Sequence, residues 1–420
     1  MATAVTRTVI SGFFHAKFLL AMPGSKDWST SEPYATQLPT WVASVPMRVV
    51  FLLPMYPLEP IGGFTVIYEF ASGLARRGHE VSIVHGHRLR NTAPPPRSRT
   101  VREVWRRARR ATGHLLRTDR GLSWFALDPR VRMLFRRSLE ARHVPDADVV
   151  VATAWQTAEY ASKYPPSKGV GCYLIQHHET WSGETERVDA TWRLPLHKLV
   201  IAAWLQDLAQ QKGLDDVVHV PIAIDLGRFK VLSPVESRPR RVAMMYSWHP
   251  WKGTDVGLAA IMAARLRVPD LTAVIFGVTE PPAGLPPWIE VRRDPRPEEL
   301  VDEIYNGAGI YLCPSLGEGW HLPPAEAMAC GCAVVSTDIG GVRDYAWHDR
   351  SALLAPPGDA SGLADALVRV ATDGALRMRL ATTGQSVIAS YSWERSADEL
   401  ERRLRDWSAG RAVDGRREAD

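Results

Sequence analysis

One stretch of the chain, residues 311–338, constrains the fold more than any other. It reads YLCPSLGEGWHLPPAEAMACGCAVVSTD. The pattern predicts a short buried strand from Gly309, a glycine-rich loop after Pro314, a helix that starts at Pro323–Pro324 and stops at Gly331, and another strand from Ala333. This order is typical of an open parallel sheet, where such a loop lies at the carboxyl edge of the strands and ligands bind.

Two carboxylates belong to this stretch, Glu318 in the loop and Glu326 early in the helix. A carboxylate in a first helical turn can simply satisfy free amides and the helix dipole, which is the plain structural interpretation of Glu326. Glu318 stands between Gly317 and Gly319, and a loop that needs so much backbone freedom commonly approaches a ligand. Glu318 is therefore the first candidate for a functional residue.

Length and composition favour a globular protein of more than one domain. A chain of 420 residues is too long for one ordinary core, and 45% hydrophobic with 23% charged residues is typical of folded proteins. The four cysteines show neither CxxC pairs nor histidines at metal spacing, so we expect buried, reduced thiols and no metal site. Reduced thiols fit a cytoplasmic location.

The basic charge is concentrated in residues 97–137, which hold thirteen arginines and three carboxylates. Apolar residues recur near helical spacing among them, and this indicates a basic amphipathic helix followed by Trp124–Phe125. Two interpretations stay open: a solvated surface helix, and a patch that binds an anionic membrane at the inner face. Nucleic acid is not expected as a partner, because no recognition motif accompanies the charge.

The first half of the chain alternates strands and helices. Residues 1–46 are expected to be a poorly ordered extension, too short in its apolar part to span a bilayer. Strands are predicted at 47–54, 80–85, 147–153, 170–176 and 217–221, and helices at 64–77 and 194–212. Gly62–Gly63 before the first helix suits either a phosphate-binding loop or a tight turn. His177, His178 and Glu179 follow a strand at the edge where a site is expected.

The second half repeats this alternation after a polar connector, residues 232–240. Strands are predicted at 241–247, 272–277 and 289–292, and helices from 254, at 297–306, 360–372, 375–390 and 393–407. Lys252–Gly253 precedes a helix, as Gly62–Gly63 does in the first half, and a lysine there can bind a phosphate. Two tandem βα domains, facing each other across a cleft, are therefore expected.

The stretch from Pro314 to Gly341 resembles the signature of retaining GT-B glycosyltransferases of family 4, which reads roughly PSxxEGFGLPxxEAMAxGxPVVxxxxGG. The likeness extends to the Gly62–Gly63 loop, to WKG at 251–253 and to YSWERSADELE at 391–401. It implies a first Rossmann-like domain for the acceptor (47–232), a second for the nucleotide-sugar (241–390), a helix crossing back to the first (391–408) and a tail (409–420).

The resemblance also implies roles for individual residues. Glu326 would hold the ribose hydroxyls, Glu318 would lie beside the donor sugar, and Lys252 would bind the diphosphate, with no metal and no cofactor beyond the donor itself. Gly62, Gly63, and the backbone near Gly319 and Trp320 would assist as donor-binding groups. His177, preferred over His178, matches a catalytic position near the sugar and acceptor.

Three departures from the family pattern bear on the donor. Ser247 stands where an arginine is common, so either His249 or an arginine from elsewhere in the chain is expected to take part in phosphate binding. Trp320–His321 replace Phe-Gly beside the sugar, and Ile222–Ala223 replace an Asn-Gly pair. The alternatives to transfer are a GT-B-like epimerase or phosphorylase, and a non-catalytic protein that binds a sugar nucleotide.

Overall fold

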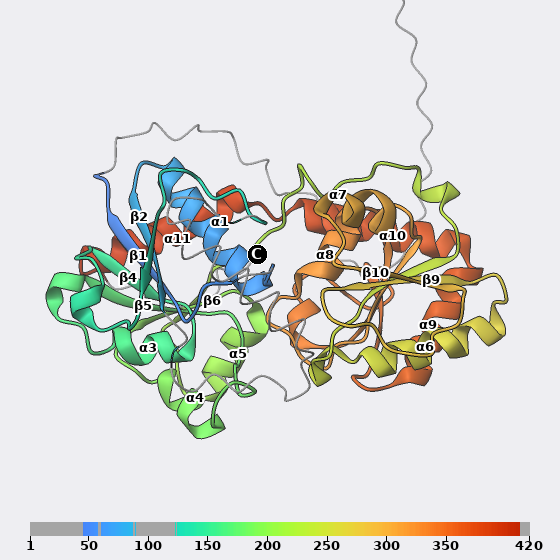
Figure 1. The fold of residues 1–420 in the computed structure, drawn as a ribbon, viewed down its shortest axis with the longest axis horizontal. Coiled ribbons are helices and arrows are strands. Elements are labelled where there is room, and N and C mark those ends of the chain that lie inside the picture. Colours follow the sequence, from blue (N-terminus) through green and yellow to red (C-terminus); the bar gives the residue numbers. More distant parts are fainter. Residues whose placement is uncertain (1–44, 58–59, 87–88, 90–121, 123, 412–420) are drawn as a thin grey trace, which may run out of the picture. The chain divides into compact units, whose positions relative to one another are not determined.

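Two parallel β-sheets organise the residues that the structure describes, which are 45–57, 60–86, 89, 122 and 124–411 of a computed structural model (Figure 1). The first sheet has the strand order β3-β2-β1-β4-β5-β6-β7 and the second β10-β9-β8-β11-β12-β13. The strands are β1 Arg48–Leu53, β2 Glu80–Gly86, β3 Arg132–Arg136, β4 Val149–Ala152, β5 Val170–Ile175, β6 His197–Val200, β7 Val217–His219, β8 Arg241–Met245, β9 Thr272–Gly277, β10 Ile289–Arg293, β11 Ile310–Cys313, β12 Ala333–Thr337 and β13 Ala352–Ala355.

The central strands form because their residues are apolar on both faces. Every residue of β11 (IYLC) and of β12 (AVVST) is buried, and five of the six residues of β1 are buried. A strand that is covered on both sides reads as a continuous apolar run rather than as an alternation, which is typical of parallel sheets covered by helices. The predicted two-sheet parallel architecture is confirmed.

Helices connect and cover these strands. They are α1 Gly62–Arg76, α3 Trp155–Ala161, α4 Thr185–Thr191, α5 Ala203–Gln211, α6 Thr254–Arg267, α7 Pro297–Glu299 with a π-helical continuation Leu300–Tyr305, α8 Leu322–Ala329, α9 Ala360–Thr372, α10 Gly374–Ala389 and α11 Trp393–Ser408. Within the described ranges, none of them is both long enough and apolar enough to cross a bilayer.

One predicted helix was wrong in its extent. Residues 194–212 do not form a single helix, because His197–Val200 form β6 and only Ala203–Gln211 are helical. Lys198, Leu199 and Val200 are buried, and β6 pairs with both β5 and β7, so pairing in the sheet overrides the local helical pattern. Strand β13 was not predicted at all.

The arginine-rich segment is described only at its carboxyl end. Residues 90–121 and 123 lie outside the described residues, so the predicted amphipathic helix is not described. Within the described part, Arg132–Arg136 form the edge strand β3, and Trp124 and Phe125 pack partly buried against Tyr68. This end of the segment therefore contains a strand that was not predicted and a core-facing aromatic pair.

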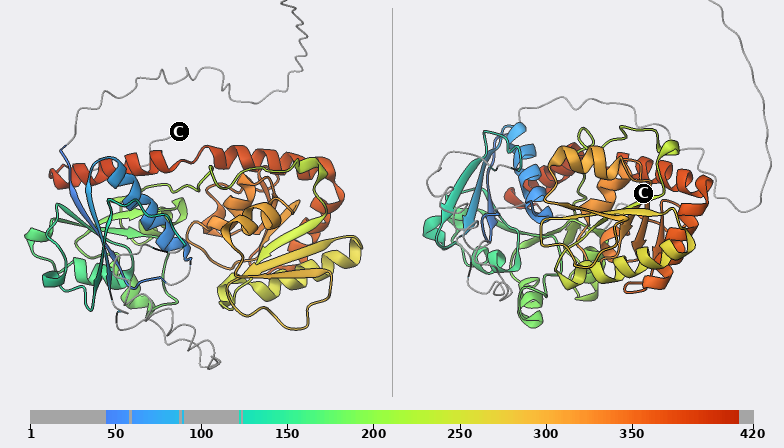
Figure 2. Two further views of the ribbon diagram at one scale, coloured as in Figure 1. Left: turned by 45° about the horizontal axis from the view of Figure 1, so that its top comes forward. Right: turned by 45° about the vertical axis from the view of Figure 1, so that its right-hand side comes forward.

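The last helix, α11, returns to the first sheet, as predicted. Figure 2 shows it, in red, running beside the blue helix α1. Ser392 caps it by accepting a hydrogen bond from the backbone of Arg395, and its buried face carries Leu400 and Leu404. Gly73 of α1 is needed at the crossing, because a Cβ there would lie 2.9 Å from the Cβ of Ala397.

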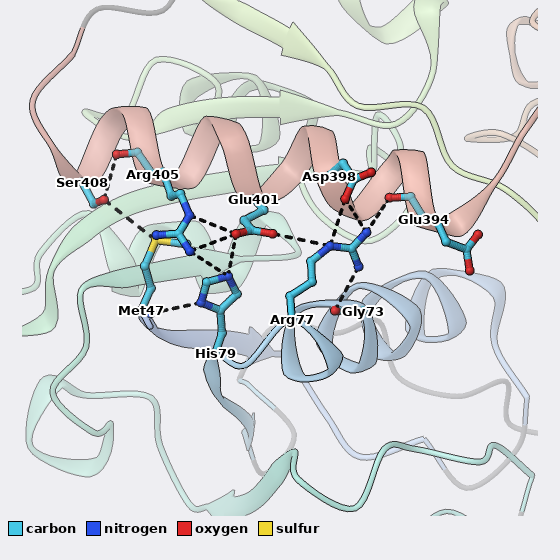
Figure 3. Close-up of polar contacts among 9 residues, drawn as sticks. All are labelled: Met47, Gly73, Arg77, His79, Glu394, Asp398, Glu401, Arg405 and Ser408. Atoms are coloured by element: carbon cyan, nitrogen blue, oxygen red, sulfur yellow. Dashed lines mark hydrogen bonds and ion pairs between the residues drawn. The ribbon is translucent and has the colours of Figure 1, made fainter. Parts of the chain in front are cut away.

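A group of polar contacts also joins α11 to the first sheet (Figure 3). Arg77 binds Asp398 and donates to the backbone carbonyl of Glu394 at 2.8 Å. The buried ring of His79 accepts from the backbone N–H of Met47 at 3.1 Å and contacts Glu401 at 3.1 Å through its other nitrogen. These contacts join α11 to the residues at the start of β1 and between α1 and β2.

Candidate active site

The candidate site lies where the strand order of the second sheet reverses direction. Strands β8 and β11 are neighbours, but the chain continues from β8 towards one edge and from β11 towards the other. The loops that follow these two strands, residues 246–253 and 314–321, therefore diverge at their carboxyl ends. Such a switch point is the usual ligand site of open parallel sheets. These loops carry Lys252 and Glu318.

Lys252 and Glu318 form an ion pair at this point. The Lys252 Nζ lies 2.8 Å from Glu318 Oε1, and both side chains are mostly buried, with 20% and 11% of their surface exposed. The position of Lys252 depends on Gly253, which has φ 61° and lies immediately before α6. A Cβ on Gly253 would lie 2.1 Å from the Pro314 carbonyl oxygen. Only glycine permits this approach of the two loops.

The charges of the pair are set by their surroundings. Burial alone would raise the pKa of Glu318, but His321 and Lys252 beside it hold that pKa below its usual value. His321 lies 3.5 Å away, yet burial lowers the pKa of its imidazole to about 4, so it is neutral near pH 7. Lys252 is therefore the cation that keeps Glu318 ionised.

Glu326 occupies a different environment. It sits in the second turn of α8, half-buried, and accepts a hydrogen bond of 2.9 Å from the Tyr305 hydroxyl. Burial raises its pKa to about 7, against the opposing influences of Tyr305 and Arg228. A carboxyl group that titrates near neutral pH and retains a free oxygen can accept from or donate to the hydroxyls of a ligand. This agrees with the ligand-facing interpretation of Glu326.

The glycine loop of the first sheet lies next to the second-sheet loop. A Cβ on Gly62 would lie 3.3 Å from Leu322 of α8, and one on Gly63 would lie 3.5 Å from the Gln176 side chain. A Cβ on Gly319 would lie only 2.1 Å from the Gln176 carbonyl oxygen. The predicted donor-binding glycines are thus brought together, with Gln176 between them.

His177 faces this site and His178 does not. The His177 ring packs edge-on against Trp181, with ring centres 4.2 Å apart, and Glu318 acts on it electrostatically. Burial lowers the pKa of His177 to about 4, and its Nδ1 is buried without a hydrogen-bond partner. His178 instead binds Asp189 at 2.6 Å. The preference for His177 over His178 agrees with this geometry.

His249 lies in the loop after β8, within a row of aromatic side chains. Its ring stands between Trp248 and Trp251, at centre distances of 3.8 and 4.2 Å, and Trp251 in turn contacts Trp181 at 5.5 Å. Burial lowers the pKa of His249, and the charge of Lys252 adds to this effect. Its Nδ1 is buried without a partner. A neutral His249 can offer a hydrogen bond to a phosphate but no charge.

The two residues that replace Phe-Gly differ in placement. The Trp320 side chain is 2% exposed and packs against Tyr345 and Tyr391, at ring distances of 4.8 and 5.5 Å. It belongs to the core, so only its backbone faces the loop. His321 begins α8 with its ring beside Glu318 and Cys313.

Sequence reasoning missed several residues of the site. The Trp204 indole N–H donates to the Gly319 carbonyl at 2.7 Å, and Tyr305 binds Glu326. The Gly340–Gly341 pair, which ends the quoted signature but was given no role, also packs on the site, because a Cβ on Gly341 would lie 2.8 Å from that of Glu318. Gln176 directly follows strand β5, and this position could have indicated a site residue. The sequence around Trp204 and Tyr305 gave no such indication, because both are typical core residues.

These features define the class of the protein. Two parallel α/β sheets, with a last helix that returns to the first, make the GT-B fold. HepE from Anabaena, solved in complex with UDP and glucose, superposes with a TM-score of 0.64 at 13% identity, over 86% of this chain and 99% of that chain. At this identity the likeness shows the fold alone.

The sequence around the second sheet is similar to a family of known proteins over about a third of the chain. Residues 240–373, which include Lys252, Glu318 and Glu326, match the profile of the family described as Glycosyl transferases group 1. The chain thus has the GT-B fold, and its residues 240–373 match the family model of the glycosyl transferases group 1.

Two curated relatives show how far the likeness reaches. D-inositol 3-phosphate glycosyltransferase of Corynebacterium jeikeium is 38% identical over 106 residues, which is 25% of either chain. Phosphatidyl-myo-inositol mannosyltransferase of Mycolicibacterium smegmatis is 27% identical over 214 residues, 47% of this chain and 55% of the relative. The chain therefore matches a quarter to about half of the length of these two relatives.

Proposed function

We propose that the chain is a retaining glycosyltransferase of family 4, which moves a sugar from a nucleotide-sugar donor to a carbohydrate, lipid-linked or natural-product acceptor without a metal. The observation that carries this proposal is the buried Lys252–Glu318 ion pair, held at the switch point of the second sheet beside α8. The group 1 profile over 240–373 and the UDP and glucose bound by HepE support a nucleotide-sugar as the donor.

Donor binding would exchange the partners of this ion pair. A diphosphate carries more negative charge than one carboxylate, so it would take Lys252 from Glu318. The freed Glu318 could then accept hydrogen bonds from the sugar hydroxyls. Glu326, whose other oxygen is held by Tyr305, would bind the ribose hydroxyls. Each group of the donor therefore has a matching residue.

The same residues suit the chemistry of transfer. As the bond from the sugar to the phosphate breaks, negative charge builds on the leaving diphosphate and positive charge on the sugar ring. Lys252 would stabilise the negative charge on the diphosphate, and Glu318 would stabilise the positive charge on the sugar ring. The site is mostly buried, so these electrostatic effects are strong. Glu318 is assigned no covalent role.

Further groups surround the expected sugar position. Gly62 and Gly63 at the start of α1 would allow backbone amides to approach the phosphates. His249 would add a hydrogen bond there, in the place of the missing arginine. His177, unpaired at Nδ1, would contact the sugar or the acceptor.

A donor screen tests the proposal directly. The full chain is incubated with UDP-, GDP- and dTDP-sugars, and nucleotide release is measured with and without a cell extract as acceptor. Release with at least one donor, with retained configuration at the anomeric carbon of the product, is expected. The absence of both binding and turnover for every donor would overturn the proposal.

A further inference from the structure

His321 has a backbone conformation that few non-glycine residues adopt. It precedes the first turn of α8 with φ 53° and ψ 80°, in the left-handed region that glycine adopts easily and bulky residues do not. The side chain is only 3% exposed. Such a conformation persists where the surroundings fix it, and it is found most often at functional sites.

Three contacts fix His321. The Tyr345 hydroxyl donates to its backbone carbonyl at 2.7 Å. Its ring Nδ1 lies 3.1 Å from the Cys313 sulfur, and its Nε2 lies 3.5 Å from Glu318 Oε1. The ring therefore spans the space between the end of β11 and the loop carboxylate, and its orientation is determined on both sides.

These contacts also determine which nitrogen carries the proton. Burial raises the pKa of the Cys313 thiol to about 11 and lowers that of His321 to about 4, so near neutral pH both groups are uncharged. If Nδ1 held the proton, the Nε2 lone pair would face an ionised carboxylate, which is repulsive. A thiol S–H that donates to Nδ1 removes this repulsion and leaves the ring proton on Nε2, pointing at Glu318.

We propose that His321 is a positioning residue for Glu318, whose Nε2–H, oriented by the Cys313 thiol, directs the carboxylate for its work on the donor sugar. This inference rests on the proposed function. The 3.5 Å separation is long for a hydrogen bond, and His321 Nε2 has no hydrogen-bond partner among the described residues. Contacts of this kind commonly shorten when the substrate binds. His321 would then hold Glu318 as Lys252 turns to the diphosphate.

Substitution at His321 distinguishes positioning from a merely structural role. His321→Gly is expected to stay folded, because glycine adopts φ 53° without strain and this offsets part of the cost of removing the buried ring. We expect kcat to fall about tenfold or more, while KM for the donor changes by less than about twofold, since the nucleotide contacts remain. His321→Gln, whose amide N–H reaches a similar place, should restore most of the loss. An unchanged kcat in His321→Gly would overturn the proposal.

Cys313 supplies a matched pair of variants. Cys313→Ser keeps an O–H that can donate to Nδ1 and should retain most of kcat, whereas Cys313→Ala removes the group that orients the ring and should lower kcat several-fold at an unchanged folded fraction. Equal kcat values in Cys313→Ser and Cys313→Ala would contradict the proposed role of the thiol.

A spectroscopic readout makes the test independent of turnover. In ¹⁵N-histidine-labelled protein, with the His321→Gln variant used to assign the signal, the His321 ring should carry its proton on Nε2 near neutral pH. A proton on Nδ1, or a charged ring, would overturn the inference even if no donor is ever turned over. Failure of the donor screen with the expected tautomer would instead count against the proposed function.

Discussion

The Nζ of Lys252 lies 2.8 Å from Oε1 of Glu318, so the two candidate residues neutralise each other before any donor binds. The pair joins the loops after β8 and β11, which are separated by more than sixty residues in the sequence. The charge of Lys252 helps to keep Glu318 ionised. A ligand with a diphosphate and a sugar can offer a new partner to each residue at once, the diphosphate to Lys252 and the sugar hydroxyls to Glu318.

Loss of Lys252 is expected to impair both catalysis and the ionisation of Glu318. Lys252→Ala should lower kcat about 100-fold or more, as is typical when a charge-stabilising group is removed. Because Glu318 loses its cation inside a buried site, its pKa should rise, and the acidic limb of the pH–rate profile should move to higher pH. Steady-state nucleotide release across pH measures both effects. Lys252→Arg is the charge-keeping control, and an unmoved acidic limb in Lys252→Ala would contradict this account.

Glu326 should make stability depend on pH in a defined direction. Its pKa is raised from 4.5 to about 7 in the fold, so over this range the folded state binds a proton that the unfolded chain has lost. Stability should therefore fall as the pH rises through this window and level off above it. Glu326→Gln should remove this fall and stabilise the protein by about 1–3 kcal/mol above pH 7. Urea unfolding at several pH values measures the difference.

The same titration should govern donor binding. A carboxylate accepts hydrogen bonds from ribose hydroxyls better when it is ionised, so donor affinity should weaken as the pH falls below about 7. In Glu326→Gln the affinity should be weaker throughout and almost independent of pH in this range. Calorimetric titration with the donor found in the screen tests this, and a Glu326→Gln variant with the affinity and pH dependence of the parent would exclude the ribose role.

Gly319 and Gly317 allow a matched test of the loop. A Cβ on Gly319 would lie 2.1 Å from the Gln176 carbonyl oxygen, whereas one on Gly317 would meet no other atom within 4 Å. Gly319→Ala should push the loop away from Gln176 and lower kcat/KM about tenfold or more, and Gly317→Ala should leave it nearly unchanged. Initial rates and thermal unfolding of both variants provide the comparison. Equal losses in the two variants would show that the Gln176 contact does not matter.

The attachment of α11 should depend on Glu401 more than on its neighbours. Glu401 contacts Arg77 and His79, which lie between α1 and β2, and Glu399 contacts only Arg402 and Arg403 of its own helix among the ion pairs of the described residues. Glu401→Ala should lower the free energy of unfolding by about 1–3 kcal/mol, since the buried ring of His79 loses its carboxylate partner. Glu399→Ala should cost less than about 1 kcal/mol. Urea unfolding compares them, and equal costs would refute the anchoring role.

Residues 97–137 carry a separate prediction, made from charge alone. If their arginines bind anionic headgroups, the protein should sediment with phosphatidylserine-containing vesicles but not with neutral ones, and added salt should weaken the binding. Replacement of Arg106, Arg107, Arg109 and Arg110 by glutamine should abolish the difference between the two lipids. Equal sedimentation with both vesicle types would remove the membrane hypothesis.

Local patterns were enough to predict most of the architecture. The spacing of Glu318 and Glu326 within a strand–loop–helix–strand pattern indicated a carboxyl-edge site, and continuous apolar runs predicted β1, β11 and β12. These inferences succeed because a buried parallel strand and a helix start leave a signal in a few neighbouring residues. The local sequence pattern did not predict the strands β6 and β13. These short strands owe their conformation to pairing in the sheet rather than to their own sequence.

By itself, the sequence determined the two-sheet architecture, the position of the loops that carry Lys252 and Glu318, and the need for glycine in them. Only the tertiary structure decided that these two side chains pair, that His177 and not His178 faces Glu318, and that His321 bridges Cys313 and Glu318. The physical reason is that strand and helix signals are local, whereas these contacts join segments far apart in the chain. Their geometry depends on how two strand orders and several helices pack, which no short segment encodes.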